Sequence, residues 1–123
     1  MHPGQGIRSI RRKLNVPQNE LARKCGISQT SLSLIETGVK RPGKKTMEKI
    51  CETFDIPESI IYIIAMQESD VPASKVGMYR LVYPSMVSLA LQMVSTEPVE
   101  TITAVYKSFH NPIVYPQVSL KAS

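Results

Sequence analysis

The sequence predicts an all-helical protein, on two observations. Apolar residues recur every three or four positions, the spacing of one helix face, from Leu21 to Cys25, from Leu32 to Ile35 and from Met78 to Met93. Between the first two of these runs stand a glycine and a serine, residues that end one helix and begin the next. Helices are therefore expected in both halves of the chain.

The first two runs form two short helices joined by a tight turn. Gln18 to Cys25 is expected to end at Gly26, which adopts the positive φ of a helix end, and Ile27 places an apolar side chain in the turn. Ser28 caps the next helix, because its hydroxyl accepts a hydrogen bond from a free N–H one turn on. The outer side of that helix then carries short, uncharged polar residues, namely Gln29, Thr30, Ser31 and Ser33. This is the arrangement of a helix-turn-helix, whose second helix enters the major groove of DNA, where glutamine reads adenine and serine or threonine several bases.

These residues resemble the phage-repressor-like helix-turn-helix family, whose members read roughly L-T-Q-E-x-L-A-x-x-x-G-V-S-x-x-x-I-S-x-I-E-x-G. This chain has Val16-Pro17-Gln18-Asn19-Glu20-Leu21-Ala22, then Gly26-Ile27-Ser28, then Leu32-Ser33-Leu34-Ile35-Glu36-Thr37-Gly38. The resemblance covers the chain from Gly6 to Met66 and implies a lambda-repressor-like domain of five helices.

The resemblance also implies elements on either side of the motif. It assigns Ile7, Ile10 and Leu14 to the inner face of the first helix, and Thr46 to Phe54 to the fourth helix, with Met47, Ile50, Cys51 and Phe54 facing inward. It implies a partly buried ion pair between Arg11 and Glu36, which keeps Arg11 out of the DNA site. Arg12 and Lys13, on the opposite face, are expected in solvent.

Two positions depart from the family pattern. Pro17 stands where members place a capping threonine or serine. Proline suits the first turn of a helix, but its side chain cannot cap the helix. The sequence therefore predicts the start of this helix only to within one residue. Leu34 lies on the DNA-facing side one turn after Thr30, where members often place arginine, lysine or glutamine. Leucine offers only apolar contact, for instance to a thymine methyl, and the alternative that it packs against a neighbouring element stays open.

Basic residues concentrate in the first half of the chain. The first fifty residues hold eleven Lys and Arg against three Glu, a net charge of +8, whereas the remainder has a net charge of −3, which together give the chain its +5. Such a basic half suits contact with DNA phosphates. The expected DNA-binding residues are Gln18, Ser28, Gln29, Thr30, Ser31, Ser33, Leu34, Lys40, Arg41 and Lys44.

Other classes of function find little support. The chain has no glycine-rich phosphate loop, paired-carboxylate motif or nucleophile elbow, so neither an enzyme nor a cofactor is expected. Cys25 and Cys51 have no C-x-x-C spacing and no histidine nearby. The two cysteines are therefore expected to act as small apolar side chains and not as a metal or disulfide site. His2 and His110 are isolated, and no role is assigned to them.

A membrane or secreted protein is not expected either. The longest apolar run, Ile60 to Met66, has seven residues, far short of a membrane span, and the N-terminus lacks the apolar core of a secretion signal. We therefore expect a cytoplasmic protein.

Two further helices are expected after the fourth. Glu58 to Met66 is apolar nearly all round, so it needs cover on more than one side. A break is expected at Asp70-Val71-Pro72. Beyond it, apolar residues follow one another at steps of 4, 4, 3 and 4 from Met78 to Met93, which predicts a helix within Ala73 to Val94. Pro84 should kink or divide this helix near Tyr83. That helix either folds back on its own subunit or, as we favour, forms part of a dimer interface. The expected interface residues are Ile61, Ile64, Met78, Val82, Met86, Leu89 and Met93.

The predicted organisation has three parts: a DNA-binding domain over residues 1–66, a helical dimerisation segment over 67–95, and a flexible tail over 96–123 that shows no consistent period. The predicted function is a dimeric, sequence-specific transcriptional regulator, most simply a repressor, that reads a palindromic operator of double-stranded DNA through the major groove. The alternative is an antitoxin-type module, whose C-terminal half neutralises a partner toxin while its N-terminal half controls their common promoter.

Overall fold

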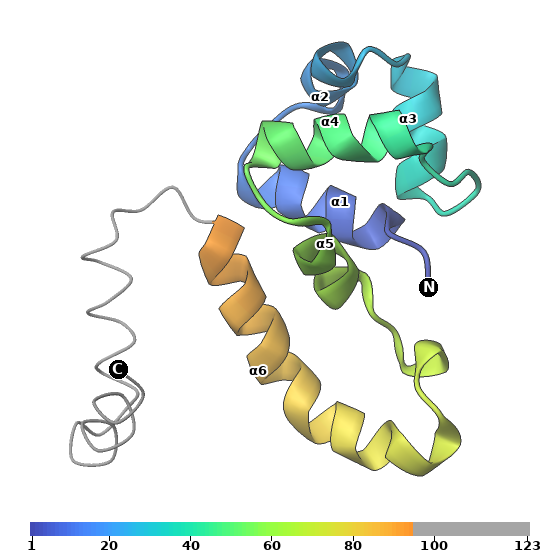
Figure 1. Ribbon diagram of the computed structural model, residues 1–123, viewed down its shortest axis with the longest axis vertical. Helices are drawn as coiled ribbons and strands as arrows, with labels where there is room; N and C mark the ends of the chain where they lie inside the picture. Colours follow the sequence, from blue (N-terminus) through green and yellow to red (C-terminus); the bar gives the residue numbers. More distant parts are fainter. Residues whose placement is uncertain (95–123) are drawn as a thin grey trace, which may run out of the picture.

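The computed structural model describes residues 1–94, and this part is all-helical, as the sequence predicts. Figure 1 shows a cluster of five helices with a sixth, longer helix running along its lower side. The predicted flexible tail over residues 96–123 lies outside the described residues. In chain order the elements are α1 (Gly4–Lys13), α2 (Gln18–Cys25), α3 (Gln29–Glu36), α4 (Lys44–Phe54), α5 (Glu58–Ala65), the short 3-10 turns η1 (Glu68–Asp70) and η2 (Ala73–Lys75), and α6 (Val76–Val94).

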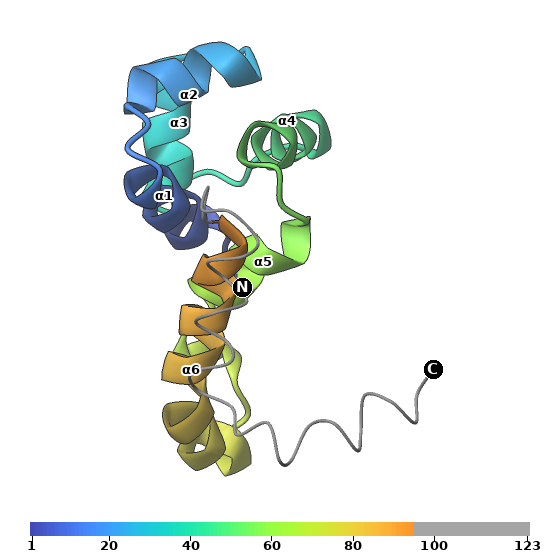
Figure 2. The same ribbon diagram turned by 90° about the vertical axis from the view of Figure 1, so that its left-hand side faces the viewer.

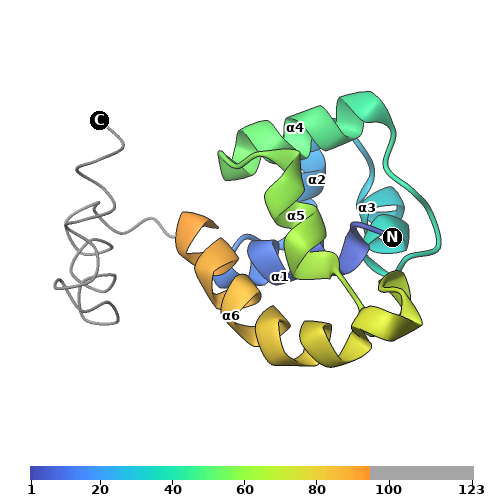
Figure 3. The same cartoon turned by 60° about the horizontal axis from the view of Figure 1, so that its bottom comes forward.

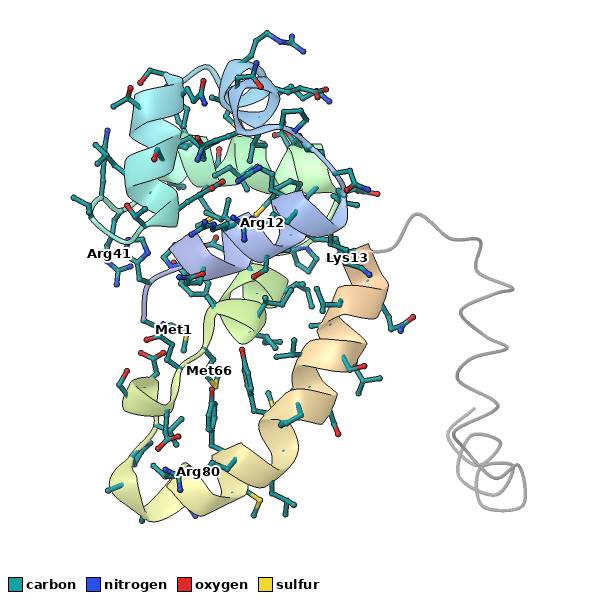
Figure 4. All side chains as sticks on the ribbon, turned by 180° about the vertical axis from the view of Figure 1, so that it is seen from behind. Met1, Arg12, Lys13, Arg41, Met66 and Arg80 are labelled. Atoms are coloured by element: carbon teal, nitrogen blue, oxygen red, sulfur yellow. The ribbon has the colours of Figure 1, made fainter. Side chains whose placement is uncertain are left out.

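Helix α1 packs closely against α3 and α5 because two of its residues have no side chain. A Cβ at Gly4 would collide with the carbonyl oxygen of Ile35, and one at Gly6 with the carbonyl oxygen of Ile61. Ile7 and Ile10, on the same helix, are core side chains with no exposed surface. The apolar face expected for this helix is confirmed, while Arg12 and Lys13 on its other side are exposed (Figure 4).

The turn between α2 and α3 has the predicted form. Gly26 ends α2 with φ +69°, and the N–H of Ile27 returns to the carbonyl of Ala22 at 3.0 Å. Ser28 caps α3 by accepting a hydrogen bond from the Ser31 N–H at 3.0 Å. Helix α2 begins at Gln18, so Pro17 does not shift its start. The carbonyl of Pro17 instead accepts the N–H groups of Glu20 and Leu21.

The core lies between α1, α2, α3, α4 and α5. Its fully buried side chains are Ile7, Ile10, Leu21, Leu32, Ile35, Ile50 and Ile61. Cys25 is buried and Cys51 half-buried, and neither forms a disulfide. Burial raises the pKa of both thiols, so both stay protonated at neutral pH and behave as small apolar side chains. The fourth helix begins two residues before the predicted Thr46, at Lys44.

Helix α6 folds back along α5 of its own subunit, as Figures 2 and 3 show. Stacked tyrosines fasten the two helices, since the Tyr83 hydroxyl donates to the Ile64 carbonyl at 2.7 Å and the Tyr79 hydroxyl to the Met66 carbonyl at 3.1 Å. These carbonyls, at the end of α5, have no partner further along that helix. Further along α6, Ala90 and Val94 join the main core.

Pro84 does not divide α6, which is continuous from Val76 to Val94. Figures 1 and 3 show the helix bending at mid-length, as expected where proline removes a backbone hydrogen bond. At its start, the guanidinium of Arg80 hydrogen-bonds the Glu68 carboxylate at 2.5 and 3.1 Å, which ties α6 to η1. These bonds hold the pKa of Glu68 below its ordinary value.

Two residues expected at a dimer interface are core residues instead. Ile61 is 0% and Ile64 7% exposed, because α5 is covered by α1, α4 and α6 of the same subunit. The sequence correctly indicated that α5 needs cover on several sides, but that cover comes from within the chain. Met86 is half-buried. The other expected interface residues are exposed, with Met78 at 62%, Val82 at 37%, Leu89 at 62% and Met93 at 57%.

Candidate nucleic-acid interface

Five of the predicted DNA-binding residues gather around one hollow on the outer side of α2 and α3. The hollow encloses about 290 Å³ and is lined by Gln18, Gln29, Thr30, Ser33 and Leu34. We call these five residues the reading face. It lies at the end of the molecule away from α6 (Figures 1 and 2). Apart from Leu34, every member offers a hydrogen-bonding group.

A chain of hydrogen bonds leads from the core to this face. The Arg11 guanidinium donates two bonds to the Glu36 carboxylate, from Nε to Oε2 at 2.7 Å and from Nη2 to Oε1 at 2.9 Å. Glu36 is only 2% exposed, so the ion pair implied by the family resemblance is present and buried. Arg11 Nη1 also donates to the Val16 carbonyl at 3.0 Å, which fixes the loop before α2.

The buried carboxylate determines how the glutamine amides point. An ionised carboxylate only accepts hydrogen bonds, so Gln18 must present its amide nitrogen, and Nε2 lies 3.1 Å from Glu36 Oε1. Gln18 Oε1 then faces outward and accepts a longer bond of 3.4 Å from Gln29 Nε2. Gln29 is left with its own Oε1 and a second N–H at the surface. That acceptor and donor pair matches the N6 and N7 edge of adenine.

Ser28 and Ser31, also predicted to bind DNA, make bonds within the protein. The Ser28 oxygen accepts the Ser31 N–H at the start of α3. The Ser31 hydroxyl accepts a bond of 3.0 Å from Lys40 Nζ. Both serines thus shape the site, one by starting the helix and the other by holding a lysine against it.

The predicted basic residues Lys40, Arg41 and Lys44 are all exposed, and the first two stand in the loop between α3 and α4. Arg41 Nη2 donates to the Met1 carbonyl at 2.6 Å, and Figure 4 shows the two residues beside each other. Lys44 is the first residue of α4. The loop therefore holds Lys40 against α3 and Arg41 against the N-terminus, and α4 begins with a third positive charge.

Two further residues near this surface were not predicted from the sequence. His2 received no role, yet its Nδ1 accepts the Gly4 N–H at 2.9 Å, so Nε2 carries the hydrogen and lies 3.1 Å from the Lys40 carbonyl. His2 thereby anchors the basic loop, and since Lys40 is 38 residues away no local pattern could have indicated it. Arg8 lines a second hollow of about 250 Å³ that also contains Gln18, Ser33 and Thr37. Arg8 stands three residues before Arg11, a spacing that puts both on the same side of a helix, and this spacing could have indicated its position from the sequence.

Residues 1–94 contain no group of three or more His, Cys, Asp or Glu side chains placed to hold a metal ion. Within the same range, no helix is both long enough and apolar enough to cross a membrane.

Comparison with known families gives one match, to a helix-turn-helix family model over residues 7–61. The matched stretch runs from α1 into α5 and includes both helices of the reading face. Residues 7–61 are a helix-turn-helix domain. This match supports the phage-repressor-like type that the sequence resembles, and it supports a role in DNA-binding transcription regulation for this domain. The family consists of DNA-binding regulatory domains and not of enzymes. The comparison with curated proteins and the comparison with solved structures each found no match.

Proposed function

We propose that the protein is a sequence-specific transcriptional repressor that binds a palindromic operator as a homodimer, with α3 of each subunit in the major groove. The observation that carries this proposal is the oriented pair of Gln18 and Gln29, whose amides are held by the buried Glu36. An amide fixed before binding discriminates between bases, because a wrong base leaves its donor and acceptor unpaired.

Phosphate contacts supply most of the affinity in this proposal. Arg8 lies beside Gln18 and Ser33 of the reading face, and Lys40 bonds to Ser31 of α3. Arg41 and Lys44 follow in the loop and at the start of α4, and none of the four basic residues forms an ion pair within residues 1–94. Side chains of this kind fix the position of the protein on the duplex without reading its sequence. Their contribution should weaken as the salt concentration rises.

The proposed dimer forms through α6. Tyr79, Tyr83, Ala90 and Val94 occupy the side of this helix that packs on the subunit, and the other side carries Met78, Leu81, Val82, Leu89 and Met93, which are 37% to 77% exposed. We call these five residues the outer stripe. A row of exposed apolar side chains on one helix is typical of an interface. A second copy of this chain is the proposed occupant of the row, because helix-turn-helix proteins bind two half-sites with two subunits related by a two-fold axis.

Base reading by Gln29 is tested by comparing its alanine variant with alanine variants of the basic residues. Gln29→Ala is expected to weaken binding to the preferred duplex by roughly 1 to 3 kcal/mol and to flatten the preference for one base pair. Lys40→Ala and Arg8→Ala should weaken binding to all duplexes by a similar factor. Fluorescence anisotropy on the preferred duplex and its single-base-pair variants, at one salt concentration, separates these two patterns. An equal loss on every duplex for Gln29→Ala would mean that α3 does not read this base.

A further inference from the structure

Leu34 is the one apolar residue of the reading face, and the core does not use it. It is 38% exposed, whereas its neighbours Leu32 and Ile35 on α3 are 0% and 1% exposed and fill the core. Leu34 is also absent from the partly buried side chains that pack against the core. Of the two interpretations left open by the sequence, packing against a neighbouring element therefore does not account for this side chain.

Its surroundings are polar. Leu34 shares the hollow of the reading face with Gln18, Gln29, Thr30 and Ser33, and it lies one helical turn after Thr30. With α3 in the major groove of DNA, a base edge beside Gln29 would therefore meet an apolar surface next to a hydrogen-bonding one. Val39, in the loop after α3, is also apolar and is 74% exposed.

The chemistry of the major groove limits what an isolated leucine can recognise there. Adenine, guanine and cytosine present donors or acceptors, and covering these groups with leucine would leave them unsatisfied. Thymine alone presents a methyl group, at C5, and 5-methylcytosine carries the same group at the same place. Burial of that methyl against Leu34 removes apolar surface of both partners from water.

We propose that Leu34 is a specificity residue that reads the 5-methyl group of a pyrimidine in each half-site, close to the base read by Gln29. The proposal rests on the proposed function, because it requires α3 to enter the major groove. It adds that part of the sequence preference depends on a methyl group and on no hydrogen bond. Cytosine methylation at that position would accordingly strengthen binding.

The test uses the full-length protein and the duplex that it enriches from a random-sequence library. Each thymine is replaced in turn, in both half-sites, by deoxyuridine, which removes only the methyl group. Replacement at one of these positions is expected to weaken wild-type binding by roughly three- to tenfold. Leu34→Ala should lose this sensitivity, Leu34→Met should keep it because methionine conserves the apolar volume, and the matched control Val39→Ala should also keep it. At the same position, 5-methylcytosine should bind more tightly than cytosine.

Several results would overturn the proposal. One is wild-type binding that is unchanged by uracil at every thymine; another is an enriched duplex with no thymine in its half-sites. A third is a uracil effect that is as large in Leu34→Ala as in the wild type. If the uracil effect were instead lost in Val39→Ala, the methyl group would be in contact with Val39 and not with Leu34. Thermal unfolding checks that the Leu34 variants are folded. Failure to enrich or bind any duplex would instead refute the proposed function, so the two failures are distinguishable.

Discussion

Replacing Arg11 by alanine is expected to lower the free energy of unfolding by about 3 to 5 kcal/mol. The loss is large because Glu36 stays behind as a carboxylate that is 2% exposed and has lost two charged hydrogen bonds. The bond from Arg11 to the Val16 carbonyl disappears as well, and with it a tie on the loop before α2. Urea denaturation followed by circular dichroism measures the change.

Arg12→Ala is the matched control, because Arg12 is exposed on the same helix and forms no ion pair within the described residues. It should change stability by about 0.5 kcal/mol or less. Arg11→Met combined with Glu36→Met should recover most of the loss, since removal of both partners leaves no unpaired charge. A loss below about 1 kcal/mol for Arg11→Ala would show that the pair is not buried in solution.

The second large effect is expected from a charge in the outer stripe of α6. Leu89→Glu should convert the dimer into a monomer, because a carboxylate on each subunit would be desolvated at the interface without a partner. Leu89 is 62% exposed in the single subunit, so the fold itself should tolerate the change. Affinity for a palindromic duplex should fall by about 10²- to 10⁴-fold, since the half-sites are no longer bound by linked subunits. Sedimentation at micromolar concentration and anisotropy on the same samples give both readouts.

Ser59→Glu provides the control, because it adds the same charge at an exposed position of α5 that is not on the outer stripe. It should remain dimeric and bind as the wild type does. A wild-type chain that sediments as a monomer would contradict the dimer. The outer stripe would then be free for a different protein, and stable co-purification of a second small protein would favour the antitoxin-type function. A Leu89→Glu variant that stays dimeric would place the interface elsewhere.

Local signals explain why the helix-turn-helix was predictable. The ends of α2 and α3 depend on single residues, Gly26 and Ser28, whose effect on the backbone needs no distant partner. The Arg11 and Glu36 pair joins residues 25 positions apart and could be placed only through the family resemblance. Gln18 was predicted only as a DNA-binding residue, and its bond to Glu36, 18 positions away, was not predicted.

Long-range contacts explain what the sequence did not predict. Ile61 and Ile64 look like candidates for a dimer interface because α5 is apolar all round, yet the tyrosines that bring α6 over α5 act through backbone carbonyls, which leave no mark in the sequence. His2 contacts a carbonyl of a loop 38 residues away. Leu81, at 77% the most exposed of the large apolar residues on α6, was missed because the periodic stripe passes through its neighbour Val82.

The basic, helix-turn-helix half of the chain is expected to bind DNA in a sequence-dependent way. The most direct measurement is the affinity of the purified full-length protein for its library-enriched duplex and for a scrambled duplex over a range of salt concentrations. We expect tighter binding to the enriched duplex at every concentration, with log K falling linearly against log salt at about −0.9 per phosphate neutralised on both. A flat response to salt, or equal affinity for the two duplexes, would contradict sequence-dependent DNA binding by this protein.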